Sequence, residues 1–400
     1  MIKKIIEIGA CLAIFSLPLY LIRFKISWIP FNLSEIIIYL VFLFWLVDKL
    51  VKKERILFPV GKKGIFYPIF FVFAGATLST LFSSNIEMSA GIWKGWFLAP
   101  LLLFLVLLDR LDNQKFFKWL ILAAAASAAA VSLISLLGWL GNNFTYDGRL
   151  KGFYSSANYL AMYLSPISIL SLALFLFVKK KIHKLLLIAA VGLMVIAIYL
   201  TYSYGAFLGL LAASVFLVFF SAKDKKNFGW ALFFFLFIIL LFASQIQTDK
   251  FQGFLNLSYP SLKSRLAIWQ SAEQILKDQP LIGIGPGMFQ KYYLAYQPRF
   301  EPYPEWVAPQ PHNLFLAFWL QTGLIGLIGF FWLLVVFFKK TREYLLVEKK
   351  EVRFLGLILA GVIIYFLVHG LVDTTYWKND LSVIFWLVIA INYRVGHLFG

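Results

Sequence analysis

The residues best suited to chemistry lie in polar segments of an otherwise apolar chain. Arg265, His312 and Asn313 belong to one long polar stretch that begins near residue 244. A guanidinium group makes bidentate contacts to phosphate, and an imidazole that titrates near neutral pH can take a proton from a hydroxyl group. Plainer interpretations stay open: Arg265 as a surface side chain of an amphipathic helix, and Asn313 or His312 as a helix cap.

A second polar loop carries Arg149 and Lys151. Gly148 and Gly152 flank these basic residues, and glycine lets the backbone approach a ligand closely. The pair is either part of an anion-binding site or a basic pair at a membrane interface.

Further ionisable residues lie near the ends of apolar stretches. His369 and Asp373 are four residues apart, so we expect them to share a helical face. An ionisable pair in such a position is either functional or makes a hydrogen bond inside the helical bundle. Lys94 is another basic candidate, and Glu35 is placed to pair with a cation.

The composition indicates an all-α polytopic membrane protein. The chain has 400 residues, of which 61% are hydrophobic and 14% charged, and a water-soluble domain has no use for so much apolar surface. We predict a single transmembrane helical bundle over residues 1–400. The apolar stretches of spanning length number twelve and lie near residues 5–22, 33–51, 65–82, 92–108, 116–140, 157–178, 184–201, 203–221, 228–244, 313–338, 353–372 and 381–398.

The distribution of charge predicts the orientation of this bundle. The net charge is +18, but the basic residues fall in short clusters between apolar stretches rather than in a basic groove with interleaved aromatic residues. We therefore expect a lipid bilayer as partner and no nucleic acid. Most Lys and Arg residues fall on one side when the N-terminus is inside, which predicts cytoplasmic termini and places loops 141–157 and 245–312 outside. No small-x-small cleavage site follows the first stretch, so we expect it to be retained.

Cysteine and histidine usage indicates no metal site. Cys11 is the only cysteine, which excludes an intramolecular disulfide, and the four histidines are scattered. We expect neither a metal ion nor a cofactor.

The long loop 245–312, between the ninth and tenth apolar stretches, has a helical pattern of its own. Apolar residues recur at helical spacing and predict an amphipathic helix over about 261–278, lying on the membrane surface or capping the bundle. Glycines and a proline over 283–287 predict a tight turn. The aromatic residues that follow suit sugar rings and lipid headgroups equally well. The helical pattern consists of Leu262, Leu266, Trp269, Ala272, Ile275 and Leu276.

Four segments together resemble the O-antigen ligase/polymerase superfamily. They are Arg265-Leu-Ala-Ile-Trp269 running to Pro280-Leu-Ile-Gly-Ile-Gly-Pro-Gly-Met-Phe289, then Pro311-His-Asn-Leu-Phe-Leu316 leading to Gln321-Thr-Gly-Leu-Ile-Gly326, then His369-Gly-Leu-Val-Asp373, and the loop from Arg149 to Asn158. The resemblance implies a glycosyltransferase of the bacterial cytoplasmic membrane that acts on its outer side. The implied donor is a glycan on an undecaprenyl-diphosphate carrier, and the transfer would be metal-independent and inverting.

The resemblance also implies roles for single residues. The catalytic residues would be His312, Arg265 and Arg149, with the arginines holding the diphosphate. The residues expected to bind substrate are Lys151, Asn158, Asn313, His369, Asp373 and Lys94. Two positions depart from the family pattern: Ala157 stands where proline is common, and Tyr204 where arginine is common.

Several functions are compatible with these motifs, and they differ in the acceptor. A ligase of lipopolysaccharide biosynthesis attaches the glycan to lipid A–core, a polymerase of O-antigen or exopolysaccharide extends a growing glycan, and a protein O-oligosaccharyltransferase uses a Ser or Thr hydroxyl. The alternative of another class is a transporter of the lipid-linked glycan. A transporter would need ionisable groups near mid-membrane or paired broken helices. The polar residues gather at one interface instead, which favours an enzyme.

Overall fold

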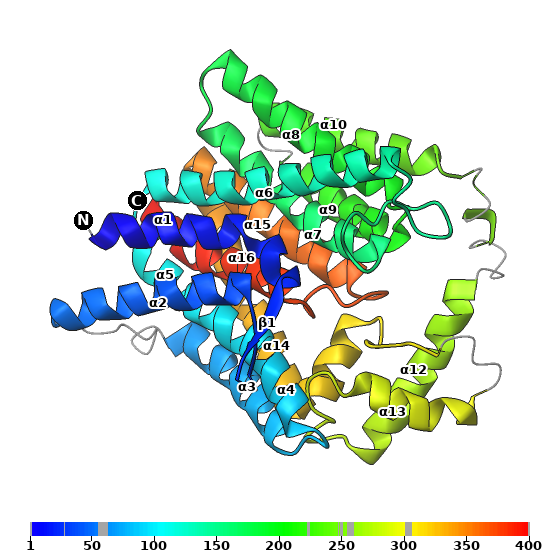
Figure 1. Cartoon of the computed structure of the whole chain (residues 1–400). Coiled ribbons are helices and arrows are strands. Elements are labelled where there is room, and N and C mark those ends of the chain that lie inside the picture. The colour runs from blue at the N-terminus through cyan, green and yellow to red at the C-terminus, as the bar shows by residue number, and fades with distance from the viewer. Residues whose placement is uncertain are drawn as a thin grey trace.

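The computed structural model describes residues 2–27, 29–54, 63–221, 225–246, 248, 251–253, 260–300 and 306–398. Helices make up 78% of it, as Figure 1 shows. The α-helices are α1 (Ile2–Phe15), α2 (Leu33–Val51), α3 (Lys63–Leu81), α4 (Ile86–Trp93), α5 (Ala99–Arg110), α6 (Gln114–Leu140), α7 (Ala157–Ser171), α8 (Lys181–Leu200), α9 (Tyr204–Ser221), α10 (Lys225–Ala243), α12 (Pro260–Asp278), α13 (Phe289–Tyr296), α14 (Leu314–Leu346), α15 (Lys350–His369) and α16 (Asn379–Leu398). Shorter turns of other helix types are η1 (Leu17–Leu21), the π-helical η3 (Lys94–Leu98), η4 (Leu172–Leu176) and η5 (Gln297–Arg299).

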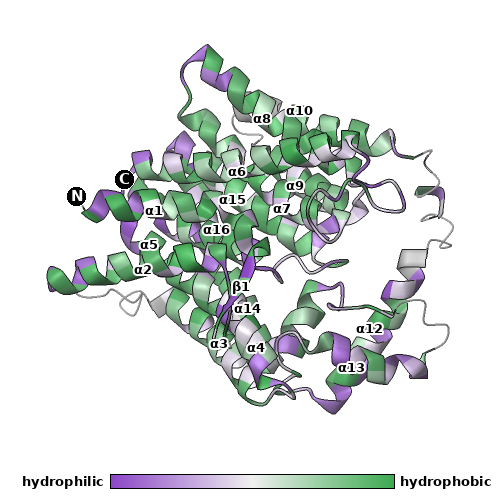
Figure 2. Ribbon diagram, in the orientation of Figure 1, coloured by the Kyte–Doolittle hydropathy of each residue, from purple (hydrophilic) through white to green (hydrophobic). Residues whose placement is uncertain are grey.

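Within the described residues, nine helical stretches are long and apolar enough to cross a membrane. This confirms an all-α polytopic membrane protein. Each of the twelve predicted stretches contains helix, but α1, α2 and α10 are not among the nine, so twelve crossings stay a prediction. Figure 2 shows the apolar bundle in green, with hydrophilic residues concentrated in loops and on parts of α12 and α13.

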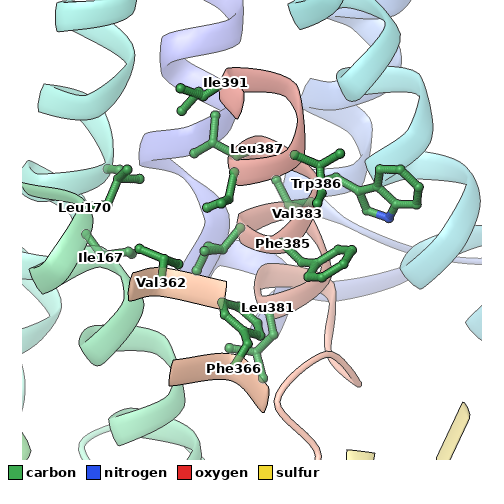
Figure 3. Packing of buried hydrophobic residues seen from close by; sticks show 14 of the residues in the cluster. Ile167, Leu170, Val362, Phe366, Leu381, Val383, Phe385, Trp386, Leu387 and Ile391 are labelled. Atoms are coloured by element: carbon green, nitrogen blue, oxygen red, sulfur yellow. The ribbon is translucent and has the colours of Figure 1, made fainter. Parts of the chain in front are cut away.

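The centre of the bundle is formed by α7, α15 and α16, which are buried along most of their length. Figure 3 shows how Ile167 and Leu170 of α7 lie beside Val362 of α15 and Leu387 of α16. Such close packing of apolar side chains fixes the ends of these helices relative to one another. Both termini lie at one end of the bundle, which we call the terminal end, and α12 and α13 lie beyond the opposite end (Figure 1).

A short hairpin interrupts the helical pattern and was not predicted. Strands β1 (Arg23–Ile26) and β2 (Ile29–Asn32) pair in antiparallel register, with Arg23 opposite Asn32. The side chain of Asn32 accepts a hydrogen bond from the Glu35 N–H at 3.0 Å, so the hairpin ends by capping α2. Four-residue strands are too short to show a periodicity in the sequence.

Helices α12 and α13 share a small apolar core of their own. Ile268, Ala272 and Ile275 of α12 are buried in it with Phe289 and Tyr293 of α13. The apolar face of α12 therefore packs on protein. Leu266, which belongs to the predicted apolar pattern, is an exception, because 58% of it is exposed.

A kink in α14 joins this unit to the bundle. Gly323 has a left-handed backbone (φ 67°) inside the helix, which interrupts the helical hydrogen bonds. Backbone N–H and carbonyl groups on either side of it pair with the turn before α13. The Ile284 N–H donates to the Leu320 carbonyl at 2.6 Å, and the Leu324 N–H donates to the Leu281 carbonyl at 2.9 Å. A side chain on Gly323 would meet the Leu281 carbonyl, so glycine is required at this joint.

Candidate active site

The carboxylate of Asp373 is the centre of a polar network at the site end of the bundle, opposite the terminal end. Asp373 lies in the segment 370–378, which connects α15 to α16, and only 3% of its side chain is exposed. Its Oδ1 lies 3.2 Å from His312 Nδ1 and accepts from the Thr374 N–H at 2.9 Å. Its Oδ2 accepts from Asn158 Nδ2 at 2.9 Å and lies 4.0 Å from Arg265 Nη2. One carboxylate thus joins segments far apart in the sequence.

The surroundings of Asp373 keep it ionised. Burial alone would raise the pKa of this carboxyl group, but the charge and hydrogen bond of His312, with the charges of His369 and Arg265, lower the pKa below its ordinary value. A buried carboxylate is tolerated where such partners surround it.

Arg149 reaches this network through Asn158. Its Nη2 donates to Asn158 Oδ1, and its Nε donates to the Thr201 carbonyl at 2.7 Å. Asn158 lies in the first turn of α7, so its amide bonds Arg149 on one side and Asp373 on the other. The loop arginine is therefore held against the ends of α7 and α8.

Arg265 extends from α12 toward the bundle. Its Nε donates to the Val372 carbonyl at 3.0 Å, and 19% of its side chain is exposed. The guanidinium group thus bonds the segment 370–378 instead of extending from α12 into the surroundings, so the interpretation as a surface arginine does not describe this geometry.

The backbone around His312 is fixed on both sides. Asn313 caps α14, accepting from the Phe315 and Leu316 N–H groups at 3.0 Å, and its Nδ2 donates to the Leu371 carbonyl at 3.0 Å. Trp269 Nε1 donates to the Pro311 carbonyl at 3.0 Å. His312 itself has φ 47°, a conformation that a side chain rarely adopts without support from its surroundings.

Comparison with known families is informative for one part of the chain. A family model described as O-antigen ligase matches residues 189–331. We call residues 189–331, which make up less than half of the chain, the O-antigen ligase segment. The resemblance of the sequence to that superfamily is thereby confirmed. No curated protein matches the chain.

The O-antigen ligase segment contains Arg265 and His312, whereas Arg149, Asn158 and Asp373 lie outside it. The structure brings these five residues together, and their roles stay predictions.

The O-antigen ligase segment also forms a groove between α12 and α14. Its volume is about 580 Å³, and Asn313, which follows His312, is one of its lining residues. Most of its walls are apolar, formed by Leu266, Trp269, Phe315, Leu316, Trp319, Leu327 and Phe331. The exposed Leu266 is therefore part of an apolar surface beside His312.

His369 is the last residue of α15, and Asp373 lies in the turn that follows. The Asp373 N–H donates to the His369 carbonyl at 3.0 Å, so the helical spacing of the two residues continues through this turn. His369 is buried and its Nδ1 lies 2.7 Å from the Tyr365 hydroxyl. A side chain on Gly205 would collide with the His369 ring, so this histidine packs against α9.

Lys94 and Lys151 lie outside the Asp373 network. Lys94 forms an ion pair with Glu35, as expected for that carboxylate, and its Nζ lies 4.2 Å from the centre of the Phe31 ring. Asn379 Nδ2 donates to the same carboxylate at 3.0 Å. Lys151 is half-buried, and within the described part of the chain its side chain makes no hydrogen bond to the network.

Tyr204 and Lys378 were not among the site residues proposed from the sequence. Tyr204 begins α9, and its hydroxyl lies 3.3 Å from Thr248 Oγ1 and within electrostatic reach of Arg149. Lys378 was not predicted; it lies five residues after Asp373 in the same connecting segment. The sequence signal that could have indicated Lys378 is a lysine and an aspartate in the same short connection between two apolar stretches.

Proposed function

We propose that this chain transfers a glycan from an undecaprenyl-diphosphate carrier to an acceptor hydroxyl, with inversion at the anomeric carbon. The O-antigen ligase match supports glycan transfer in general. The observation that carries the specific proposal is the set of contacts around Asp373, which gathers an imidazole and two guanidinium groups from three segments.

His312 is the proposed general base. Its Nδ1 faces the Asp373 carboxylate, so the neutral ring carries its proton on Nδ1 and keeps a lone pair on Nε2. The acceptor oxygen attacks the anomeric carbon and forms the new C–O bond while Nε2 takes its proton. The bond from that carbon to the diphosphate oxygen breaks, and the electron pair leaves with the diphosphate. Asp373 orients the ring and stabilises the resulting imidazolium.

Arg265 and Arg149 are the proposed diphosphate ligands. Negative charge grows on the leaving oxygen as the glycosidic bond breaks, and guanidinium groups already in place stabilise it without reorganisation. The Nε atoms of both arginines are bonded to carbonyl groups of the protein, which fixes the planes of the two guanidinium groups. In this scheme the arginines supply the charge stabilisation that a metal ion supplies in other phosphate sites.

The apolar groove between α12 and α14 is the proposed site for the first part of the carrier's isoprenoid chain. Asn313, next to the proposed base, is one of its lining residues, and most of its walls are aromatic and aliphatic, with Gln270 and Glu273 as polar exceptions. A lipid chain in this groove would direct the diphosphate toward the arginines. Lys151, Lys94, Asn158, Asn313 and His369 stay as proposed substrate-binding residues, of which Asn158 and Asn313 lie nearest to the network.

A product assay tests this proposal. The full-length protein in lipid nanodiscs would receive a defined undecaprenyl-diphosphate-linked glycan and one of three acceptors: a lipid A–core glycan, a growing glycan chain or a protein. The proposal predicts release of undecaprenyl diphosphate together with an inverted glycoside on one acceptor. The competing function, transport of the lipid-linked glycan, is tested with the protein in lipid vesicles. Movement of intact donor across the bilayer, with no diphosphate released, would identify a transporter and contradict the proposal.

A further inference from the structure

Lys378 has a position that the proposed mechanism does not use. It is the last residue of the segment 370–378, directly before α16. Its Nζ lies 4.3 Å from the centre of the Tyr159 ring. Tyr159 follows Asn158 in α7, and its phenol is within electrostatic reach of Asp373. The ammonium group therefore lies on an aromatic face, and the residue that carries this ring is next to Asn158 of the network.

The charge of Lys378 is not neutralised by the protein. Within the described residues, no carboxylate lies at ion-pair distance from its Nζ. The nearest acidic influence is Asp380, and that carboxylate already accepts from the Tyr154 hydroxyl at 3.2 Å and from the Leu381 N–H at 2.9 Å. A half-buried ammonium group without an anion is costly, because burial removes its hydration.

The pKa of Lys378 agrees with this description. Burial lowers it from the ordinary value, and the charge of Arg23 lowers it further, while Asp380 opposes the shift. An anion bound at the ammonium group would restore the charged form. Lys94 differs, since Glu35 already neutralises it.

We propose that Lys378 binds the phosphate groups of the donor from the side of Tyr159. This inference rests on the proposed function and adds a third cationic ligand to that site. It makes Lys378 a substrate-binding residue that determines affinity for the donor and has no contact with the acceptor.

Binding of farnesyl diphosphate to the full-length protein in detergent tests the inference. We expect Lys378→Gln to weaken this binding about tenfold, the scale of one lost hydrogen bond to a charged group. Lys378→Arg keeps the positive charge and should bind nearly as wild type. The matched control is Lys277→Gln, because Lys277 is exposed on α12 and pairs with Glu273 at 3.0 Å. With the complete donor, Lys378→Gln should raise the KM for the donor and leave the KM for the acceptor unchanged.

The pH dependence of binding separates a direct contact from a structural role. Affinity of the wild type should fall as the pH rises through the lowered pKa of Lys378, below 10.5, because the ammonium group then loses its proton. The charged or titratable groups that face it are Tyr159 of α7, Asp380 of α16 and Arg23 of β1. Lys378→Arg should remove this alkaline loss, and that variant decides the question if Lys378→Gln fails to fold.

The outcomes distinguish the inference from the function on which it rests. Wild-type affinity and donor KM in Lys378→Gln, with both impaired in Arg265→Gln, would overturn the role of Lys378 and leave the proposed function intact. A rise in the acceptor KM alone would also overturn it. A wild type that neither binds farnesyl diphosphate nor releases diphosphate from the donor would overturn both.

Discussion

The ion pairs at the terminal end of the bundle are short, whereas those of the two arginines around Asp373 are long. At the terminal end, Asp48 pairs with Arg110, and Lys49 lies 2.7 Å from Asp109. Each buried cation there has a carboxylate, and the pairs join α2 to α5. At the site end, Asp373 is shared by His312 and Arg265 at 3.2 and 4.0 Å. Arg149 reaches Asp373 only through Asn158 and lies 3.9 Å from Asp147.

This difference separates charges that hold helices together from charges available to a ligand. A buried pair that is complete has no further need of a counter-ion. At the site end, Arg265 and Arg149 lie 4.0 and 3.9 Å from their carboxylates, so these long pairs leave a phosphate group as a stronger partner for the guanidinium groups. Variants at the two ends should therefore fail differently: at the site end by losing activity, and at the terminal end by losing stability.

The largest effect is expected at the proposed general base. His312→Ala should lower turnover by about 10² to 10⁴-fold, the usual contribution of a positioned base, with unchanged expression. The matched control is His183→Ala, since His183 is exposed at the start of α8, at the terminal end. Initial rates of glycoside formation measure both variants. Wild-type turnover in His312→Ala would refute its assignment as the base.

Removal of a diphosphate ligand should have the next largest effect. Arg265→Ala is expected to slow turnover by about a hundredfold or more, because one preorganised donor to a developing anion contributes roughly 3 to 4 kcal/mol. Arg342→Ala serves as the control, because Arg342 is exposed near the C-terminus of α14. The assay is single-turnover release of undecaprenyl diphosphate. Equal release by the two variants would show that Arg265 is not a ligand of the leaving group.

A break in the ionic cluster of the terminal end should reduce stability instead. Asp48→Asn removes the buried carboxylate that Arg110 and Lys52 share and leaves Arg110 with Asp109 alone, at 3.1 Å. It should lower the free energy of unfolding by about 3 kcal/mol, the lower end of the range for a broken buried pair. Thermal unfolding in detergent measures this change, and activity per folded molecule should be retained. Glu343→Gln is the control, since its pair with Lys340 is exposed and contributes roughly 0 to 1 kcal/mol. An unchanged melting temperature in Asp48→Asn would contradict the structural role of the terminal end.

The smallest effect concerns acid stability at the site end. The folded protein lowers the pKa of Asp373, so its charge contributes stability above the ordinary carboxyl value of about 3.9, and this contribution is lost as the pH falls through the lower folded value. The melting temperature of wild type should therefore fall more steeply below about pH 4 than that of Asp373→Asn. Parallel pH profiles for the two proteins would argue against the contacts around Asp373.

The sequence predicts much of the helical architecture because membrane spans are long and strongly apolar. The residues proposed from the motifs also converge: Arg149, Arg265 and His312 lie around one carboxylate. The helix α12 follows from its own periodicity, which is a local property.

What the sequence could not predict depends on contacts between distant segments. Asn158 and Asp373 are 215 residues apart, and only the fold shows that an amide joins them. The spacing of His369 and Asp373 places them one turn apart, but only the fold shows that the His369 side chain bonds Tyr365 while Asp373 contacts His312. Lys378 has no motif around it, and its proximity to Tyr159 results from the packing of α16 against α7.

The central claim is that Arg149 and Arg265, whose ion pairs at the site end are long, hold a diphosphate leaving group. The most direct measurement is single-turnover release of undecaprenyl diphosphate from a defined lipid-linked glycan by wild type and by Arg149→Ala, in the presence of acceptor. The account predicts one diphosphate released for each inverted glycoside formed by wild type, and a rate at least about a hundredfold lower for Arg149→Ala. Recovery of intact donor from wild type, or equal rates for the two proteins, would contradict it.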